Sequence, residues 1–368
     1  MAQQHLDPAD PRTGPVGTDP TGDTLAGYLR DQATEFLRAL RLHRETGSGT
    51  HGSEASAEAA RALRRSARRI SASLHTFQPL LDSDWCESMR PELAWVSGTL
   101  AMEHAYTARL ERLLTALHRL SGSTAFPSQA AGADGPASPR ARDAGARATA
   151  TAATAAPERG NLTVGAAKAG ALLDRQLTLA RTRAHSTALQ ALGSSRFHAV
   201  ADKVAVLASE VPLRTTAAAT DLRPHATAAE ERLRDAVTAL PLVTAGHPYN
   251  AAALVHGLSP DTVPHPQDAP WHQVRLLLRL HRYAREALTG PKGNAVVDLR
   301  LLSAGQALNR HRDASEAAAA AAQAARTPRI APATAYALGV LHADQRHEVE
   351  AARFAFQQAW QKETVSAS

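Results

Sequence analysis

Residues 60–77, ARALRRSARRISASLHTF, place arginines at offsets of 0, 3, 4, 7 and 8 along an expected helix. That spacing normally marks the apolar stripe of an amphipathic helix, but here the stripe is cationic. No acidic residue occurs between Glu58 and Asp82, so we expect no i,i+4 pairing along the helix to neutralise it. The basic positions are Arg61, Arg64, Arg65, Arg68 and Arg69.

A second basic helix is expected at residues 271–288, WHQVRLLLRLHRYAREAL, where acidic residues are absent from 269 through 285. An offset of 211 residues maps Arg64 onto Arg275 and Arg68 onto Arg279. The same offset maps Arg61 onto His272. Two basic helices with a shared spacing, one in each half of the chain, indicate an internal duplication. His272, Arg275, Arg279 and Arg282 share one face of the second helix.

The rest of the chain is typical of an all-α protein, because alanine, leucine, arginine and glutamate fill long windows and alternating strand patterns are scarce. Long antiparallel helices are expected at 24–42, 54–81, 91–120, 165–192, 196–209, 226–240, 271–288, 294–325 and 333–362. Breaker-rich composition predicts a disordered tail at 1–23, a flexible low-complexity insertion at 122–160 and a Pro-rich loop at 241–270.

Composition narrows the class of protein. The 368 residues include 41 basic and 35 acidic ones, a formal net charge of +6, and only four of the basic residues are lysines. Arginine is permanently charged, and its planar donors match phosphate oxygens. The single cysteine, Cys86, excludes an intrachain disulfide framework and any multi-cysteine metal site. With neither a secretory signal nor a membrane-length apolar run, the expected location is the cytoplasm.

These features favour a concave basic surface between helical bundles that holds a polyanion. Proteins that read nucleic acid sequence need aromatic platforms or polar side chains that reach base edges, and the two basic helices carry few of either. A ligand made of phosphate alone therefore fits better. The alternative is a helical scaffold whose basic face binds an acidic protein or, non-specifically, nucleic acid. A merely solvated charged face is the simplest reading of a single arginine run.

Several ordered motifs resemble the CHAD family, the conserved-histidine α-helical domain. Residues 59–81 are similar to the first basic motif of that family, and ELAWVSGTL at 92–100 is similar to the stretch that follows it. In the second half, 271–288 keeps His272, Arg275, Arg282, Tyr283 and Glu286 of the family pattern. LNRHRDA at 308–314 resembles a further family motif, with His311 and Asp313 in place.

The resemblance implies two four-helix bundles, related by a pseudo-twofold axis around a basic cavity, with halves at 24–215 and 222–363. It also implies binding of inorganic polyphosphate without catalysis, with association with polyphosphate granules as an extension. The phosphate-binding residues implied are Arg61, Arg64, Arg65, Arg68, Arg69, His272, Arg275, Arg279, Arg282 and His311, and Asp313 would orient the arginines or His311. The family's first histidine is replaced by Arg61, and an expected arginine is Ser71.

Other chemistry finds less support in the sequence. His272 and His311 could ligate a metal, but a metal site needs converging carboxylate, histidine or cysteine partners. The basic stripes lack the carboxylates that phosphate hydrolysis would use, and the ExExK motif of triphosphate tunnel enzymes is missing. We therefore expect no catalytic residue, no metal and no cofactor.

Overall fold

The computed structural model describes residues 21–46, 53–122, 156–247, 265–289 and 298–361, and in these ranges every regular element is a helix. The only β-type pairings there are two isolated bridges, Thr21 with Asp221 and Leu81 with Leu213. The all-α prediction is confirmed. The longer helices are α1 (Gly22–Thr46), α2 (Ser53–Thr76), α3 (Ser83–Ser121), α4 (Ala156–Leu192), α5 (Ser195–Ser209), α6 (Arg223–Thr238), α9 (Ala269–Thr289), α10 (Leu299–Ala325) and α11 (Pro332–Gln361).

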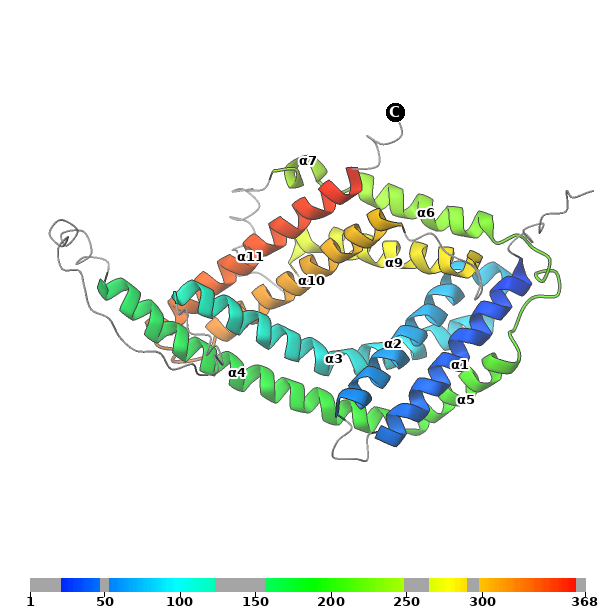
Figure 1. Ribbon diagram of the computed structural model, residues 1–368, viewed down its shortest axis with the longest axis horizontal. Coiled ribbons are helices and arrows are strands. Elements are labelled where there is room, and N and C mark those ends of the chain that lie inside the picture. The colour runs from blue at the N-terminus through cyan, green and yellow to red at the C-terminus, as the bar shows by residue number, and fades with distance from the viewer. Residues whose placement is uncertain (1–20, 47–52, 123–155, 248–264, 290–297, 362–368) are drawn as a thin grey trace, which may run out of the picture.

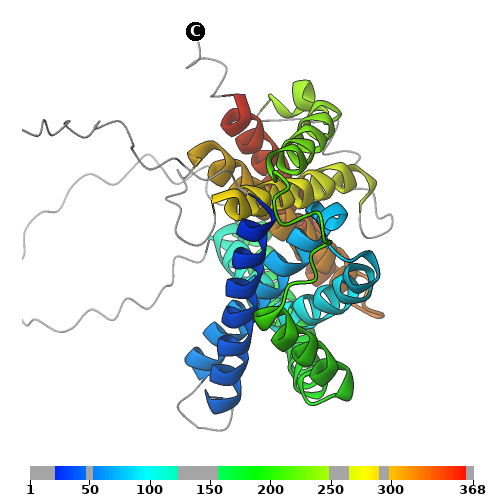
Figure 2. The ribbon, with the colours of Figure 1, turned by 90° about the vertical axis from the view of Figure 1, so that its right-hand side faces the viewer.

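The helices pack in pairs that run alongside one another. Figure 1 shows α1 beside α2, α3 beside α4, and α10 beside α11. α6 lies along α9, as the view from the side also shows (Figure 2). The basic helices α2 and α9 contact each other directly, although their first residues are more than 200 positions apart in the chain. This contact brings the two halves of the expected duplication together.

In the described part of the chain, buried apolar side chains form three clusters, which cross the expected boundary between the halves. One joins α1, α2, α5 and the start of α3 to the end of α9. Another joins α3 and α4 to α10 and α11. The third joins α6 and the start of α9 to the opposite ends of α10 and α11. The expected arrangement as two four-helix bundles stays a prediction, and α3 and α4 share a core with α10 and α11 of the second half.

The third expected helix begins earlier than proline suggested. The sequence placed its start at Pro91, whereas α3 begins at Ser83 and contains Pro91. The side chain of Asp82 caps the helix by accepting a hydrogen bond from the backbone N–H of Trp85 at 2.7 Å. Cys86 therefore lies within the helix, fully buried, and burial raises the pKa of its thiol to about 11. Gly122 ends α3 with a φ of 67°, the left-handed conformation that glycine adopts without strain.

Three of the expected irregular segments are partly helical. The tail expected at 1–23 lies outside the described residues up to position 20, but Gly22 begins α1 and its N–H donates to the carbonyl of Thr220. Of the insertion expected at 122–160, residues 123–155 lie outside the described part, and α4 already starts at Ala156. The Pro-rich stretch contributes α7 (Leu242–Ala245) and the 3₁₀ helix η2 (Pro266–Asp268), while 248–264 lie outside the described residues.

Candidate anion-binding site

Five arginines from three helices converge where α2, α9 and α10 meet. Arg64 and Arg68 come from α2, Arg275 and Arg279 from α9, and Arg312 from α10. They lie close enough to repel one another: Arg64 interacts with Arg279 and Arg312, and Arg275 interacts with the same two groups. We call these five residues the arginine cluster.

Burial makes the positive charges of the arginine cluster costly. Burial, followed by repulsion from Arg64 and Arg279, lowers the pKa of Arg68 to about 9. Burial and repulsion from Arg279 and Arg312 lower the pKa of Arg275 to about 10. The pKa values of Arg64 and Arg279 are lowered for the same two reasons. All of these groups are still protonated at neutral pH, so the site keeps its positive charge.

Several polar side-chain nitrogens in this region have no hydrogen-bond partner in the described residues. Among the residues that the structure describes, Nε and Nη1 of Arg275 and Nε2 of His272 are buried without a hydrogen bond. Buried polar groups are nearly always satisfied, and an orphaned one needs an explanation. By contrast, Arg68 donates from Nε to Oγ of Ser97 at 2.9 Å, which fixes its guanidinium against α3. The unused donors of Arg275 and His272 are the strongest local sign of a ligand.

The remaining arginines of α2 are paired with acids, which corrects the expectation of an unneutralised stripe. Arg61 and Arg65 both donate to Glu58, at 2.8 and 2.9 Å, in an exposed group of three residues. Arg69 donates from Nε to Oε2 of Glu286 on α9 at 2.7 Å. Its guanidinium carbon also lies 5.3 Å from the ring centre of Tyr283. The stripe therefore divides into two sets. Arg61, Arg65 and Arg69 are paired with acids, whereas Arg64 and Arg68 belong to the arginine cluster.

Residues of α10 complete the surroundings of the cluster. Asp313 accepts two hydrogen bonds from Arg312, at 3.0 and 2.5 Å, and so holds an arginine that was not among the predicted phosphate contacts. Glu316 lies between Arg312, at 3.7 Å, and Arg109 of α3, at 2.6 Å. Arg282 lies near the cluster and repels Arg279. Positive charge thus exceeds negative charge throughout this region.

His311, predicted as a phosphate contact, is 1% exposed and lies beneath the site rather than in it. Its ring stacks on Trp271 at 5.7 Å and meets the ring of His272 edge to face at 5.5 Å. Burial lowers the pKa of His311 to about 4, against the opposing effect of Asp268, so the imidazole is neutral. Its nearest carboxylate is Asp268 at 3.6 Å and not Asp313.

Sequence reasoning missed a buried ionic network around Asp268, which is 0% exposed. Arg346 and Arg353 of α11 donate to its carboxylate at 2.7 Å each, and Oγ of Ser315 donates at 2.6 Å. Burial alone would raise the pKa of this carboxyl, but contacts with His311, Arg346 and Ser315 hold it well below its ordinary value. The available signal was an acidic residue directly before a helix whose next acid is Glu286, near its end.

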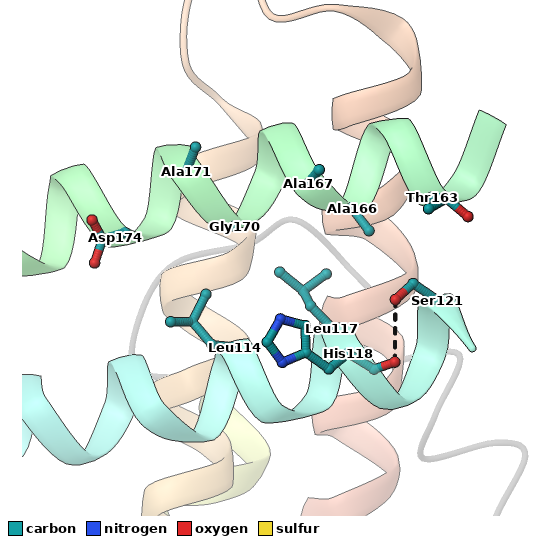
Figure 3. Close-up of a pocket in the computed structure, with 10 residues that line it drawn as sticks. All are labelled: Leu114, Leu117, His118, Ser121, Thr163, Ala166, Ala167, Gly170, Ala171 and Asp174. Atoms are coloured by element: carbon teal, nitrogen blue, oxygen red, sulfur yellow. Dashed lines mark hydrogen bonds between the residues drawn. The ribbon is translucent and has the colours of Figure 1, made fainter. Parts of the chain in front are cut away.

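Two pockets lie away from the arginine cluster and contain none of the predicted site residues. One, of about 350 Å³, lies between α3 and α4 and is lined mainly by alanine and leucine, with His118 and Asp174 as its ionisable groups (Figure 3). The other, of about 630 Å³, lies between α10 and α11 and includes Arg300 and Arg310. Both are separate from the site described here.

The described ranges contain neither a candidate metal-binding group nor a candidate membrane-spanning helix. They contain no group of three or more histidine, cysteine, aspartate or glutamate side chains that could hold a metal ion. Likewise, none of their helices is both long and apolar enough to cross a membrane.

Fold and site together define an all-helical protein in which two similarly spaced basic helices, one from each half of the chain, meet in a cluster of partly buried arginines. The CHAD domain family model matches residues 31–322, so the chain belongs to the CHAD family. It is also 74% identical to a protein of known structure, PptA from Streptomyces chartreusis, with a TM-score of 0.74. That match covers 93% of this chain and 100% of the other. No curated protein matches the chain.

Proposed function

We propose that this protein binds inorganic polyphosphate in the arginine cluster and does not act on it catalytically. The observation that carries the proposal is the set of partly buried guanidinium groups of Arg64, Arg68, Arg275 and Arg279, which have no carboxylate partner in the described residues. Buried charges without counter-charges destabilise a protein unless a ligand supplies the missing charge. Membership of the CHAD family and the likeness to PptA are consistent with this ligand.

The chemistry of the donors favours phosphate. Each guanidinium presents several N–H groups in one plane, a geometry that matches two oxygens of a phosphate group. Helices α2 and α9 are in contact and both contribute these groups, so one stretch of a polyanion would contact both halves of the chain. Aromatic side chains for stacking bases are scarce on these helices, which favours a phosphate chain over nucleic acid.

The same residues support the proposal of binding without turnover. The guanidinium groups stay protonated at pH 7 even where burial lowers the pKa to about 9 or 10, so they donate hydrogen bonds and do not accept protons. We extend the proposal to localisation: a protein that binds polyphosphate at this site would collect on cytoplasmic polyphosphate granules. Fluorescence microscopy of cells with and without polyphosphate would test this extension, and an unchanged distribution would contradict it.

The decisive comparison is between polyphosphate and nucleic acid. Isothermal titration calorimetry with long-chain polyphosphate and with duplex DNA, each over a series of salt concentrations, separates a phosphate site from a general basic surface. We expect polyphosphate to bind more tightly at every salt concentration and to retain measurable binding where DNA no longer binds. Comparable affinities that fall together as salt rises would contradict the proposal and favour a non-specific basic face. Binding of an acidic protein in place of polyphosphate would do the same.

A further inference from the structure

Asp268 occupies a special place in the fold. It ends η2 and directly precedes α9, the helix that carries His272, Arg275 and Arg279. Its carboxylate accepts hydrogen bonds from Ser315 of α10 and from Arg346 and Arg353 of α11. A buried carboxylate at the N-terminus of a helix also interacts favourably with the helix dipole. The start of α9 is thereby tied to α10 and α11.

A second set of contacts leads from Asp268 to His272. Arg353, held by Asp268, donates from Nε to Nε2 of His311 at 3.3 Å. The same nitrogen of His311 lies 3.6 Å from Oδ1 of Asp268. His311 in turn packs between the rings of Trp271 and His272. The imidazole of His272 therefore rests on a ring whose orientation depends on Asp268 and Arg353.

Polar nitrogens next to this network have no hydrogen-bond partner in the described residues, so a ligand that reaches them could supply one. His272 and Arg275 lie three positions apart on α9, so their side chains project from the same face. Nε2 of His272 and two N–H groups of Arg275 are buried and have no partner in the described ranges. The charged groups that act on His272 are Asp268 of η2, Arg275 of its own helix, and Arg312 and Glu316 of α10. Two cations and two anions surround it, with His311 as the neutral support.

We propose that Asp268 is a positioning residue for anion binding: by holding His311 against His272, it presents His272 to the phosphate group that Arg275 also contacts. The inference rests on the proposed function, because it assigns a role within the same site. Asp268 itself does not touch the ligand, since it is completely buried beneath the two histidines.

The test is a double-mutant cycle on polyphosphate affinity, measured by titration calorimetry with wild type, D268N, H272Q and the double variant. Removal of a residue that orients a binding group typically weakens binding about tenfold or more, and we expect about tenfold for D268N. Because Asp268 acts through His272, the same change made in H272Q should weaken binding by less than about twofold. A merely structural Asp268 would have its full effect in both backgrounds, and that result would overturn the proposal.

Matched variants keep the test decisive. D344N makes the same substitution at a carboxylate that pairs with Arg119 at the α3–α11 contact, and it should leave the affinity unchanged. If D268N fails to fold, S315A removes only one hydrogen bond to Asp268 and should weaken binding about threefold, again only when His272 is present. Wild-type affinity in D268N, or in S315A if D268N does not fold, would refute the positioning role. Absence of binding by wild type would refute the proposed function instead.

Discussion

Replacing Arg275 by glutamine should stabilise the empty protein while weakening its binding of anions. Burial and neighbouring arginines lower the pKa of Arg275 from 12.5 to about 10. Because one pKa unit corresponds to about 1.4 kcal/mol, keeping this group charged at neutral pH costs the folded state about 3 kcal/mol. Glutamine removes the charge but also loses packing of the aliphatic stem, so we expect a net gain of about 1 kcal/mol in the free energy of unfolding.

Arg69→Gln is the matched control, because the structure predicts the opposite sign. Arg69 is equally part of the α2 stripe, yet Glu286 pairs with it and raises its pKa despite burial. Removing Arg69 leaves a half-buried Glu286 without this partner, which should lower the free energy of unfolding by about 1–3 kcal/mol. Both variants would be measured by urea unfolding followed by circular dichroism, in a chloride buffer free of phosphate and sulfate.

In the presence of saturating polyphosphate, wild type should have a higher free energy of unfolding than the Arg275 variant, the reverse of the order in the empty protein. A ligand present at 100 times its dissociation constant stabilises the folded state by about 2.7 kcal/mol, and the variant with weaker binding gains less. If Arg275→Gln lowers the free energy of unfolding in the empty protein as much as Arg69→Gln does, then Arg275 is not an uncompensated charge. That result would refute the reasoning behind the site.

Three further predictions concern binding. The pKa of His272 lies below its ordinary value in the empty site and should rise next to a bound anion. The affinity for polyphosphate should therefore increase as the pH falls from about 8 to 5. An affinity that does not change with pH, or that changes in the same way in H272Q, would contradict this prediction. Arg64→Gln should weaken polyphosphate binding at least about fivefold. Arg65→Gln should change it less than about twofold, because the Arg65 side chain is exposed and paired with Glu58. Equal effects of the two variants in calorimetry would show that the division of the α2 arginines into two sets is wrong. The plot of log affinity against log salt should have a slope near −4 for five arginines, and Arg275→Gln should reduce its magnitude by about one; an unchanged slope would place Arg275 outside the contact.

Much of the site follows from local patterns in the sequence. Helical spacing predicts that Arg64 and Arg68 share a face, and the internal repeat predicts Arg275 and Arg279 as their counterparts. All four lie in the cluster because α2 and α9 pack together. The all-α fold class was also predictable from the sequence, because helix propensity and hydrophobic periodicity are local properties that extend over a few turns.

The rest depends on contacts between distant segments. Glu286 pairs with Arg69 across 217 positions, a distance that local spacing does not reveal. Asp268 lies in a Pro-rich stretch that predicted a loop with little to pack, yet it is fully buried by Arg346 and Arg353 of the last helix. The burial of Arg346 and Arg353 on α11 could not be predicted from the sequence, because their carboxylate partner Asp268 lies far away in the chain.

One comparison of two double variants tests directly whether the arginine cluster binds polyphosphate. The first double variant combines Arg275→Glu with Arg279→Glu, in the cluster. The second combines Arg175→Glu with Arg183→Glu, at two exposed positions on α4 outside the cluster. The two variants change the net charge equally. Titration calorimetry with long-chain polyphosphate should show that the first variant loses binding while its helix content stays that of wild type, and that the second binds within about threefold of wild type. Equal losses in both variants, or unchanged binding in the first, would contradict the assignment of the site.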